Sequence, residues 1–229
     1  NLLALGLHPL VDSQLVLPGK VESFDADVDQ FDPIPQFHQL GQLGTHRGRD
    51  RDESSGCVII GAGFGVGDVF YDIGANIGAY TLYAAKARSV PVVAFEPNPF
   101  SYRVLVHNFH LNAITDRVLP LCLAAGGPDG TGIGLQVLAF RLDDLAAIEG
   151  IPAPTHVKID VDGIEAAILE GAKSLLSGPG VRSVLIEMLT HDDAAQARIT
   201  SLLEECGLKP VDLPDDGSDN RLFTHVTRA

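Results

Sequence analysis

Four acidic side chains stand at the ends of short, mostly apolar runs of the sequence. The runs cover residues 69–71, 92–95, 157–159 and 181–186, and the acids that close them are Asp72, Glu96, Asp160 and Glu187. A carboxylate at such a position can hold a cation, accept hydrogen bonds from hydroxyl groups or take a proton as a general base. These residues are therefore the first candidates for a ligand site.

A glycine-containing turn follows the first of these runs directly. It reads Asp72-Ile-Gly74-Ala-Asn76-Ile-Gly78, and a helix-like segment, 79–88, comes after it. Glycine lets the backbone approach a ligand closely, but Asp72 replaces the first glycine of the dinucleotide fingerprint. A carboxylate there would repel a pyrophosphate and suits the amino group or sulfonium of S-adenosylmethionine. Glu96, 18 residues beyond Gly78, stands about where a carboxylate takes ribose hydroxyls.

A second glycine cluster, Gly61-Ala-Gly63-Phe-Gly65-Val-Gly67, offers a rival nucleotide loop. It is followed by Asp68 and a strand-like run rather than by a helix, so it lacks the free N–H groups that bind a phosphate. We interpret this cluster as a connector. The rival function that it would support is a nicotinamide-dependent oxidoreductase.

The sequence around Asp160 combines several charged residues with a predicted helix start. His156, Lys158 and Asp160 alternate along one face of a strand, which is costly unless they approach its ligand-binding end. Lys158 is expected to neutralise Asp160, which is also a candidate contact to the cofactor. Asp162 and Glu165 have the spacing of a helix capping pair.

If the substrate is an alcohol that acts as a nucleophile, a general base could assist it, because a neutral hydroxyl is a poor nucleophile. The candidates are Asp160, Glu187 and His191. The alternative for His191 is a place at a helix start, with Thr190 as the cap and Asp193 in the first turn. Oxygen ligands from Asp160, Asp162 and Glu187 could also gather a divalent cation, but their spacing does not require one, and we expect no metal site.

Short apolar runs alternate with helical segments from Asp68 onward, which indicates βαβ units on a mostly parallel sheet. Helices are predicted over 164–176 and 192–206, and Asn98 followed by Pro99 predicts another helix start. Two strand candidates after the last helix predict a closing antiparallel hairpin. The predicted strands cover residues 69–73, 92–96, 118–124, 157–161, 181–188, 209–213 and 221–227.

The chain divides at about residue 67. Residues 1–67 are irregular and are predicted to form a segment over the strand ends, a candidate substrate lid, and 68–229 the ligand-binding domain. The formal net charge of −14 argues against a nucleic acid or a membrane surface as partner. No apolar run is long enough to cross a bilayer, and three scattered cysteines suit a reducing compartment, so we expect a cytoplasmic protein.

The motifs together resemble the FkbM family of S-adenosylmethionine-dependent methyltransferases over roughly residues 68–190. The resemblance rests on the Asp72–Gly78 turn, Phe95-Glu-Pro-Asn98, Arg141-Leu-Asp-Asp144 and Lys158-Ile-Asp-Val-Asp-Gly-Ile-Glu165. It implies a class I methyltransferase (Rossmann-like) α/β fold, S-adenosylmethionine as cofactor, and O-methylation of a hydroxyl on a small metabolite such as a sugar or polyketide.

The resemblance also implies roles for individual residues. Asp72, Gly74, Asn76 and Gly78 would surround the methionyl part of the cofactor. Glu96, with Pro97 and Asn98, would lie at the ribose, and Ala124 and Ala125 at the adenine. Acceptor specificity is expected in residues 1–67 and 126–134. A module that binds the cofactor without turnover is the remaining alternative.

Overall fold

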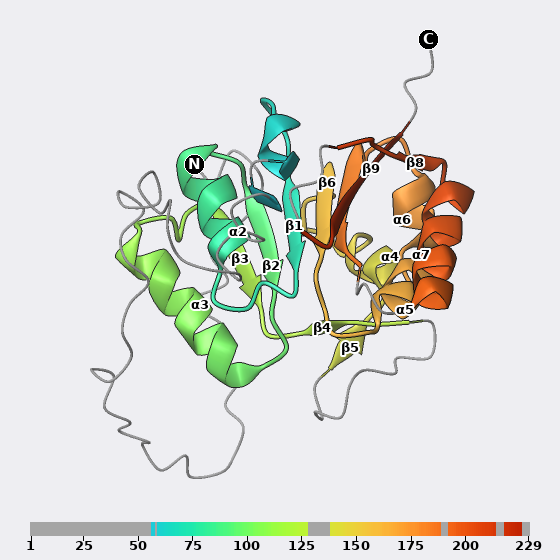
Figure 1. The fold of residues 1–229 in the computed structure, drawn as a ribbon. Helices are drawn as coiled ribbons and strands as arrows, with labels where there is room; N and C mark the ends of the chain where they lie inside the picture. The colour runs from blue at the N-terminus through green and yellow to red at the C-terminus, as the bar shows by residue number, and fades with distance from the viewer. Residues whose placement is uncertain (1–55, 58, 128–137, 189–191, 214–217, 226–229) are drawn as a thin grey trace.

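The computed structural model describes residues 56–57, 59–127, 138–188, 192–213 and 218–225 (Figure 1). Seven strands form one sheet in the order β3-β2-β1-β6-β7-β9-β8. The strands from β3 to β7 in this order are parallel, and β9 is antiparallel to β7 and β8. The mostly parallel sheet with a C-terminal antiparallel hairpin is thus confirmed. The strands are β1 Phe70–Ile73, β2 Val92–Phe95, β3 Val118–Leu121, β6 His156–Ile159, β7 Ser183–Glu187, β8 Leu208–Pro210 and β9 Asn220–His225.

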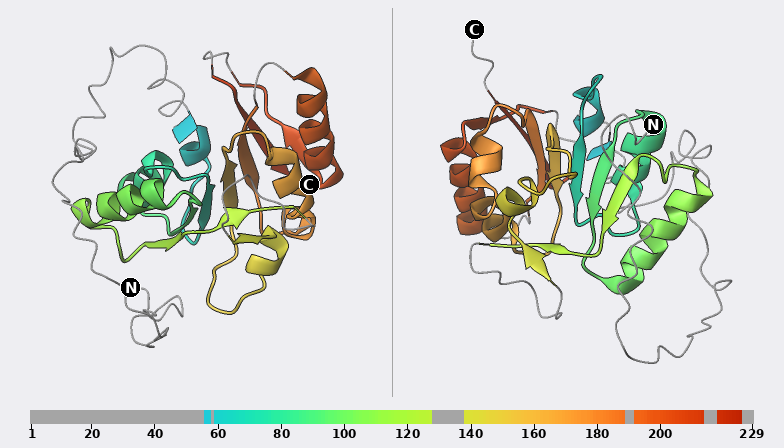
Figure 2. Two further views of the ribbon diagram at one scale, coloured as in Figure 1. Left: turned by 90° about the horizontal axis from the view of Figure 1, so that it is seen from below. Right: turned by 180° about the vertical axis from the view of Figure 1, so that it is seen from behind.

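Helices cover both faces of the sheet (Figures 1 and 2). One face carries α2 Ala79–Leu82, the π-helical η4 Tyr83–Ala87 and α3 Pro99–Leu111. The other carries α4 Leu142–Leu145, α5 Glu165–Glu170, α6 Lys173–Ser177 and α7 Asp193–Glu205. Two apolar clusters result, because successive strand residues point to opposite faces. Phe70 packs with α2 and α3, whereas Tyr71 packs with α5 and α7.

Strand β3, Val118–Leu121, is shorter than the predicted strand 118–124. The ladder between β2 and β3 ends at Phe95 and Leu121, where β2 itself stops before Pro97. Proline has no N–H group to continue a ladder. Ala124 and Ala125 instead form β4 and pair with β5, Ala139–Phe140, in a separate two-stranded sheet.

The predicted helix 164–176 is divided into α5 and α6. The division falls at Gly171, where a Cβ atom would lie 2.3 Å from the carbonyl oxygen of Gly126. The close approach of this neighbouring chain interrupts the regular helix. Helix 79–88 similarly changes from α to π geometry after Leu82.

The two predicted helix starts have different outcomes. Asn98 accepts a hydrogen bond from the Phe100 N–H and Pro99 opens α3, as predicted. Helix α7 is capped by Asp192, which accepts from the Ala194 and Ala195 N–H groups. Asp193 is thus the first helical residue rather than a partner three positions after the cap. Thr190 lies outside the described residues.

The glycine cluster Gly61–Gly67 lies at the amino ends of the strands. Residues 59–62 are helical, and a turn and then β1 follow them. Gly61 lies against the Tyr83 ring and Gly63 against His156, the first residue of β6. The described part of the predicted lid therefore packs at the amino edge of the sheet, and residues 1–55 lie outside the described chain.

Candidate active site

The glycine turn lies where the direction of strand order reverses. The chain runs from β1 to β2 and β3 on one side, and then returns to place β6 on the other side of β1. In open α/β sheets a ligand crevice forms at this point, beyond the carboxyl ends of the strands. Gly74 has a φ of 76°, and a Cβ atom there would lie 1.9 Å from the Asp160 carbonyl oxygen. Only glycine fits this close approach of the β1 and β6 ends.

A cavity of about 450 Å³ opens at this edge of the sheet, within the roughly 300–1,000 Å³ typical of small-molecule sites. Its walls combine apolar side chains such as Phe95 and Leu123 with three carboxylates. Most of the predicted cofactor residues line it. They are Gly74, Asn76, Glu96, Pro97, Asn98, Ala124, Ala125 and Asp160.

Glu96 joins the end of β2 to the glycine turn. Its Oε2 atom accepts a hydrogen bond from the Asn76 N–H at 2.8 Å, and its Oε1 atom accepts from the Asn98 N–H at 2.8 Å. Burial raises the pKa of the Glu96 carboxyl, although these two N–H groups oppose the rise. A carboxylate offers about four acceptor positions, so Glu96 can still accept hydrogen bonds from a ligand in the cavity.

Asp72 and Gly78 lie beneath the cavity and do not line it. Asp72 is fully buried; its Oδ2 atom accepts from the Thr81 hydroxyl at 2.6 Å, and its Oδ1 atom lies 3.4 Å from Lys158 Nζ. Gly78 has a φ of 99° and precedes α2, and a Cβ atom there would lie 2.6 Å from a methyl group of Leu105. Both residues therefore support the turn from below.

Lys158, Asp160 and Glu187 form a charged group at the ends of β6 and β7. Lys158 Nζ lies 2.9 Å from Asp160 Oδ2, and Asp160 extends into the cavity. Burial, together with the charge of Asp160 and a hydrogen bond to it, raises the pKa of the Glu187 carboxyl to about 7. The structure thus brings Asp160 and Glu187 together. His191, the third predicted base, lies outside the described residues.

Several lining residues were not predicted from the sequence. Asp162 lines the cavity, and α5 starts at Glu165 with Ile164 in the cap position, so the predicted Asp162–Glu165 capping pair is wrong. Glu165 instead accepts a hydrogen bond from the Gly163 N–H. Ser101 lies in the first turn of α3 and Leu123 lies between β3 and β4, and no sequence signal identifies either as a lining residue.

The site fits S-adenosylmethionine by the chemistry of its lining residues as well as by its size. Carboxylates line the part of the cavity near Gly74 and Asp160, where a cationic group would be stabilised, and small apolar side chains line the part near Ala124. Among the described residues, no three His, Cys, Asp or Glu side chains are grouped so that they could hold a metal ion.

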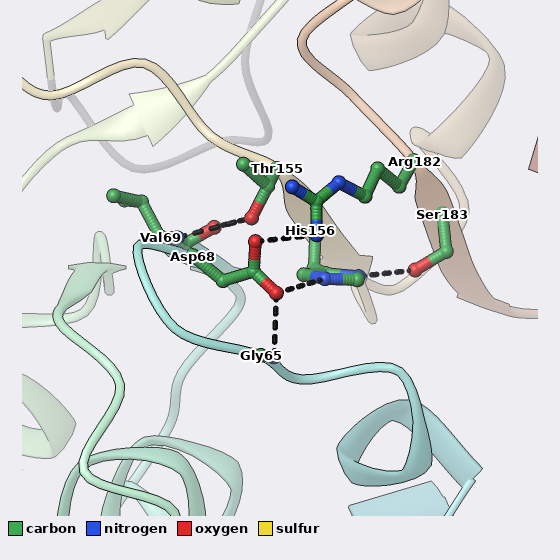
Figure 3. Close-up of polar contacts among 7 residues, drawn as sticks. All are labelled: Gly65, Asp68, Val69, Thr155, His156, Arg182 and Ser183. Carbon is green, nitrogen blue, oxygen red and sulfur yellow. Dashed lines mark hydrogen bonds and ion pairs between the residues drawn. The ribbon is translucent and has the colours of Figure 1, made fainter.

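A second polar group lies at the opposite, amino edge of the sheet (Figure 3). His156 bridges Ser183, at 2.7 Å from Nδ1, and Asp68, at 3.1 Å from Nε2. Asp68 Oδ1 lies 2.8 Å from Arg182 Nη1. Asp68 Oδ2, the atom that contacts His156, also accepts a hydrogen bond from the Gly65 N–H. Although these residue types match a hydrolytic triad, Ser183 and His156 are 6% and 1% exposed. A substrate could not reach the hydroxyl, so the group anchors the turn before β1.

The sheet order and the position of the cavity together define the class I methyltransferase fold. Residues 72–210 match the model of the methyltransferase FkbM domain, and the chain belongs to this family. The predicted family, and with it S-adenosylmethionine as the cofactor, are thus confirmed. The glycine cluster Gly61–Gly67, with its order of helix, turn and strand, gives no support to the oxidoreductase alternative.

The names of two curated relatives specify small molecules as their substrates. The chain is 28% identical to hexuronic acid methyltransferase AglP of Haloferax volcanii, over 62% of this chain and 63% of that protein. It is 29% identical to 31-O-demethyl-FK506 methyltransferase FkbM of Streptomyces tacrolimicus, over 63% of this chain and 74% of that protein. The chain thus spans less than two thirds of AglP.

Two further comparisons bear on the fold and on the predicted partners. The crystal structure of methyltransferase FkbM from Methylobacillus flagellatus has a TM-score of 0.55 and 20% identity, covering 69% of this chain and 43% of that one. A tRNA (guanine(37)-N(1))-methyltransferase of Xenopus tropicalis is 25% identical over 63% of this chain and 31% of that protein. The exclusion of nucleic acid therefore stays a prediction. No helix in the described residues is long and apolar enough to span a membrane.

Proposed function

We propose that this protein transfers a methyl group from S-adenosylmethionine to a hydroxyl of a small metabolite, such as a sugar or a polyketide. The observation that carries the proposal is the pairing of Asp160 with Glu187 at the ends of β6 and β7. Asp160 also lines the cavity that the glycine turn and Glu96 share. A proton acceptor therefore stands at the edge of the cofactor cavity.

The residues of the cavity would each act on a different part of the reaction. Glu96 and the turn at Gly74 and Asn76 would hold the cofactor, which supplies an electrophilic methyl group when bound. The Asp160–Glu187 pair would take the proton of the acceptor hydroxyl. A base with a pKa near neutral suits this step, because it is largely ionised at working pH and still accepts a proton.

The names of the relatives support an oxygen acceptor on a small molecule. One relative acts on 31-O-demethyl-FK506, and another acts on a hexuronic acid. The acceptor itself is proposed only by class. Cofactor contacts by Asp72, Gly78, Pro97, Asn98, Ala124 and Ala125, a catalytic role of His191, a lid formed by residues 1–67 and a cytoplasmic location remain predictions.

Calorimetry and an acceptor screen test the proposal. The protein should bind S-adenosylmethionine and not NAD, and it should form S-adenosylhomocysteine with at least one hydroxylated sugar or macrolide. Glu187→Gln should bind the cofactor but lose turnover, and Glu149→Gln, an exposed acid away from the cavity, should leave both unchanged. Methylation of RNA alone would replace the small-molecule acceptor, and binding without turnover on any acceptor would favour the inactive binding module.

A further inference from the structure

Lys158 is a buried cation with partners on every side. Its Nζ atom lies 2.9 Å from Asp160 Oδ2 and 3.4 Å from Asp72 Oδ1, and it donates a hydrogen bond to the Gly74 carbonyl oxygen at 3.2 Å. The ring of Tyr80 lies 4.5 Å from the same nitrogen. One side chain thus joins the end of β1, the glycine turn, α2 and the end of β6.

Neutralisation of Asp160 alone does not explain this arrangement. Lys158 is only 2% exposed, and a buried ammonium group is costly unless it is paired and hydrogen-bonded. Burial opposes its charge, but the two adjacent carboxylates, Asp72 and Asp160, hold the pKa of Lys158 above its usual value. The lysine therefore remains charged and fixed in place beneath the cavity.

The two partners of Lys158 differ in their exposure. Asp72 is fully buried, whereas the Asp160 side chain is 36% exposed and lines the cavity. The lysine holds Asp160 by its Oδ2 atom, and Asp160 also forms a side-chain hydrogen bond with Glu187. Asp72 balances the charge of Lys158 from below. Lys158 therefore links the buried Asp72 to Asp160 at the surface of the cavity.

We propose that Lys158 is a positioning residue of methyl transfer, which fixes Asp160 at the cavity and beside Glu187, so that Glu187 is the group that takes the proton of the acceptor. This inference rests on the proposed function. Without the lysine, no adjacent cation would offset the charge of Asp160 on Glu187, and the pKa of Glu187 would rise further. The lysine makes Glu187 the member of the pair that gains and loses a proton.

The proposed proton path is balanced in atoms and electrons. As the acceptor oxygen bonds to the methyl carbon, the carbon–sulfur bond breaks and its electron pair stays on sulfur. The hydroxyl proton passes through Asp160, which lines the cavity, to the Glu187 carboxylate, and then leaves to water. The charged groups around this path are Asp72 on β1, Glu96 after β2, Lys158 on β6, Asp160 after β6 and Asp219 before β9. Tyr80 and Thr81 lie on α2.

A pair of substitutions at Lys158 tests the positioning role. Lys158→Met keeps the length of the side chain without its charge, and Lys158→Arg keeps the charge. The charge of Lys158 lowers the pKa of Glu187, so Lys158→Met should move the acidic limb of the kcat profile upward. Lys158→Arg should return the limb most of the way to its wild-type position. Lys173→Met, which removes an exposed lysine paired with Glu205, should not move the limb.

A carbon-detected NMR titration of the Glu187 carboxyl provides a readout that needs no acceptor, with Glu187→Gln to assign its resonance. The same upward shift is expected in Lys158→Met. If this variant does not fold, Asp72→Asn/Lys158→Met removes both buried charges and leaves Asp160 without its cation. An unchanged Glu187 titration in the folded variant would overturn the positioning role, whereas a shifted titration with no methyl transfer by the wild type would overturn only the proposed function.

Discussion

The backbone N–H of Asn76 donates a hydrogen bond to Glu96 Oε2 at 2.8 Å, which ties the turn after β1 to the end of β2. Both residues line the cavity, so one carboxylate sets the distance between two parts of the cofactor site. Glu96 therefore has a structural task in addition to its predicted contact with ribose.

Glu96→Gln should weaken S-adenosylmethionine binding. The substitution replaces one carboxylate oxygen by an amide NH₂ group, which cannot accept from the Asn76 or Asn98 N–H. Loss of a hydrogen bond to a charged group costs about 1.5–3 kcal/mol, equivalent to roughly a 10- to 150-fold higher Kd by calorimetry. Glu149→Gln is the matched control. An unchanged Kd in Glu96→Gln would show that this carboxylate does not hold the cofactor.

Gly74→Ala should destabilise the protein more than Gly163→Ala. Both glycines have positive φ, so alanine costs on the order of 1–2 kcal/mol at each. Only at Gly74 does the added Cβ meet backbone, the Asp160 carbonyl, while nothing lies within 4 Å at Gly163. The steric overlap should add about 1–3 kcal/mol, measured by thermal or urea unfolding. Equal losses at the two positions would contradict the close approach of the β1 and β6 ends.

Activity should rise with pH through about 7, the pKa of the Glu187 carboxyl. The proposed base works only in its deprotonated form, so kcat should fall on the acidic side of this value. Glu187→Gln should abolish the limb and lower kcat by about 100-fold or more, the usual contribution of a general base. A wild-type profile with no acidic limb near pH 7 would remove Glu187 from the proton path.

The stability of the protein should depend on His156 below pH 6.5. Burial lowers the pKa of the His156 imidazole from 6.5, although the adjacent Asp68 opposes the effect. The unfolded chain therefore binds the proton first as the pH falls. The contribution of neutral His156 is fully present above pH 6.5 and is lost as the pH falls through the folded pKa.

His156→Gln isolates this effect in urea unfolding at a series of pH values. The difference in unfolding free energy between wild type and variant should shrink as the pH drops below 6.5. The difference is the appropriate quantity, because carboxyls with a raised pKa, such as Glu187, act in the opposite direction. A difference that stays constant with pH would mean that the imidazole is not held neutral.

Local features of the fold follow from the sequence alone. The alternation of apolar runs with helical periods predicts the parallel sheet and its final hairpin, and the Asn98-Pro99 pair predicts the start of α3. The turn at Gly74 and the acid at Glu96 follow equally directly. These signals depend on neighbouring residues, so a reading of the chain along its length detects them.

Tertiary contacts determine where the acidic residues of the site point. Asp72 and Lys158 are register partners on β1 and β6, although 86 residues separate them, and their pairing removes Asp72 from the cavity. Asp162 lines the cavity, and α5 begins two residues later than a capping pair would require. Strand register and burial arise from contacts between distant segments, which periodicity and capping signals do not encode. The sequence by itself therefore determined which carboxylates stand at the strand ends, and only the tertiary structure decided which of them reach the cavity.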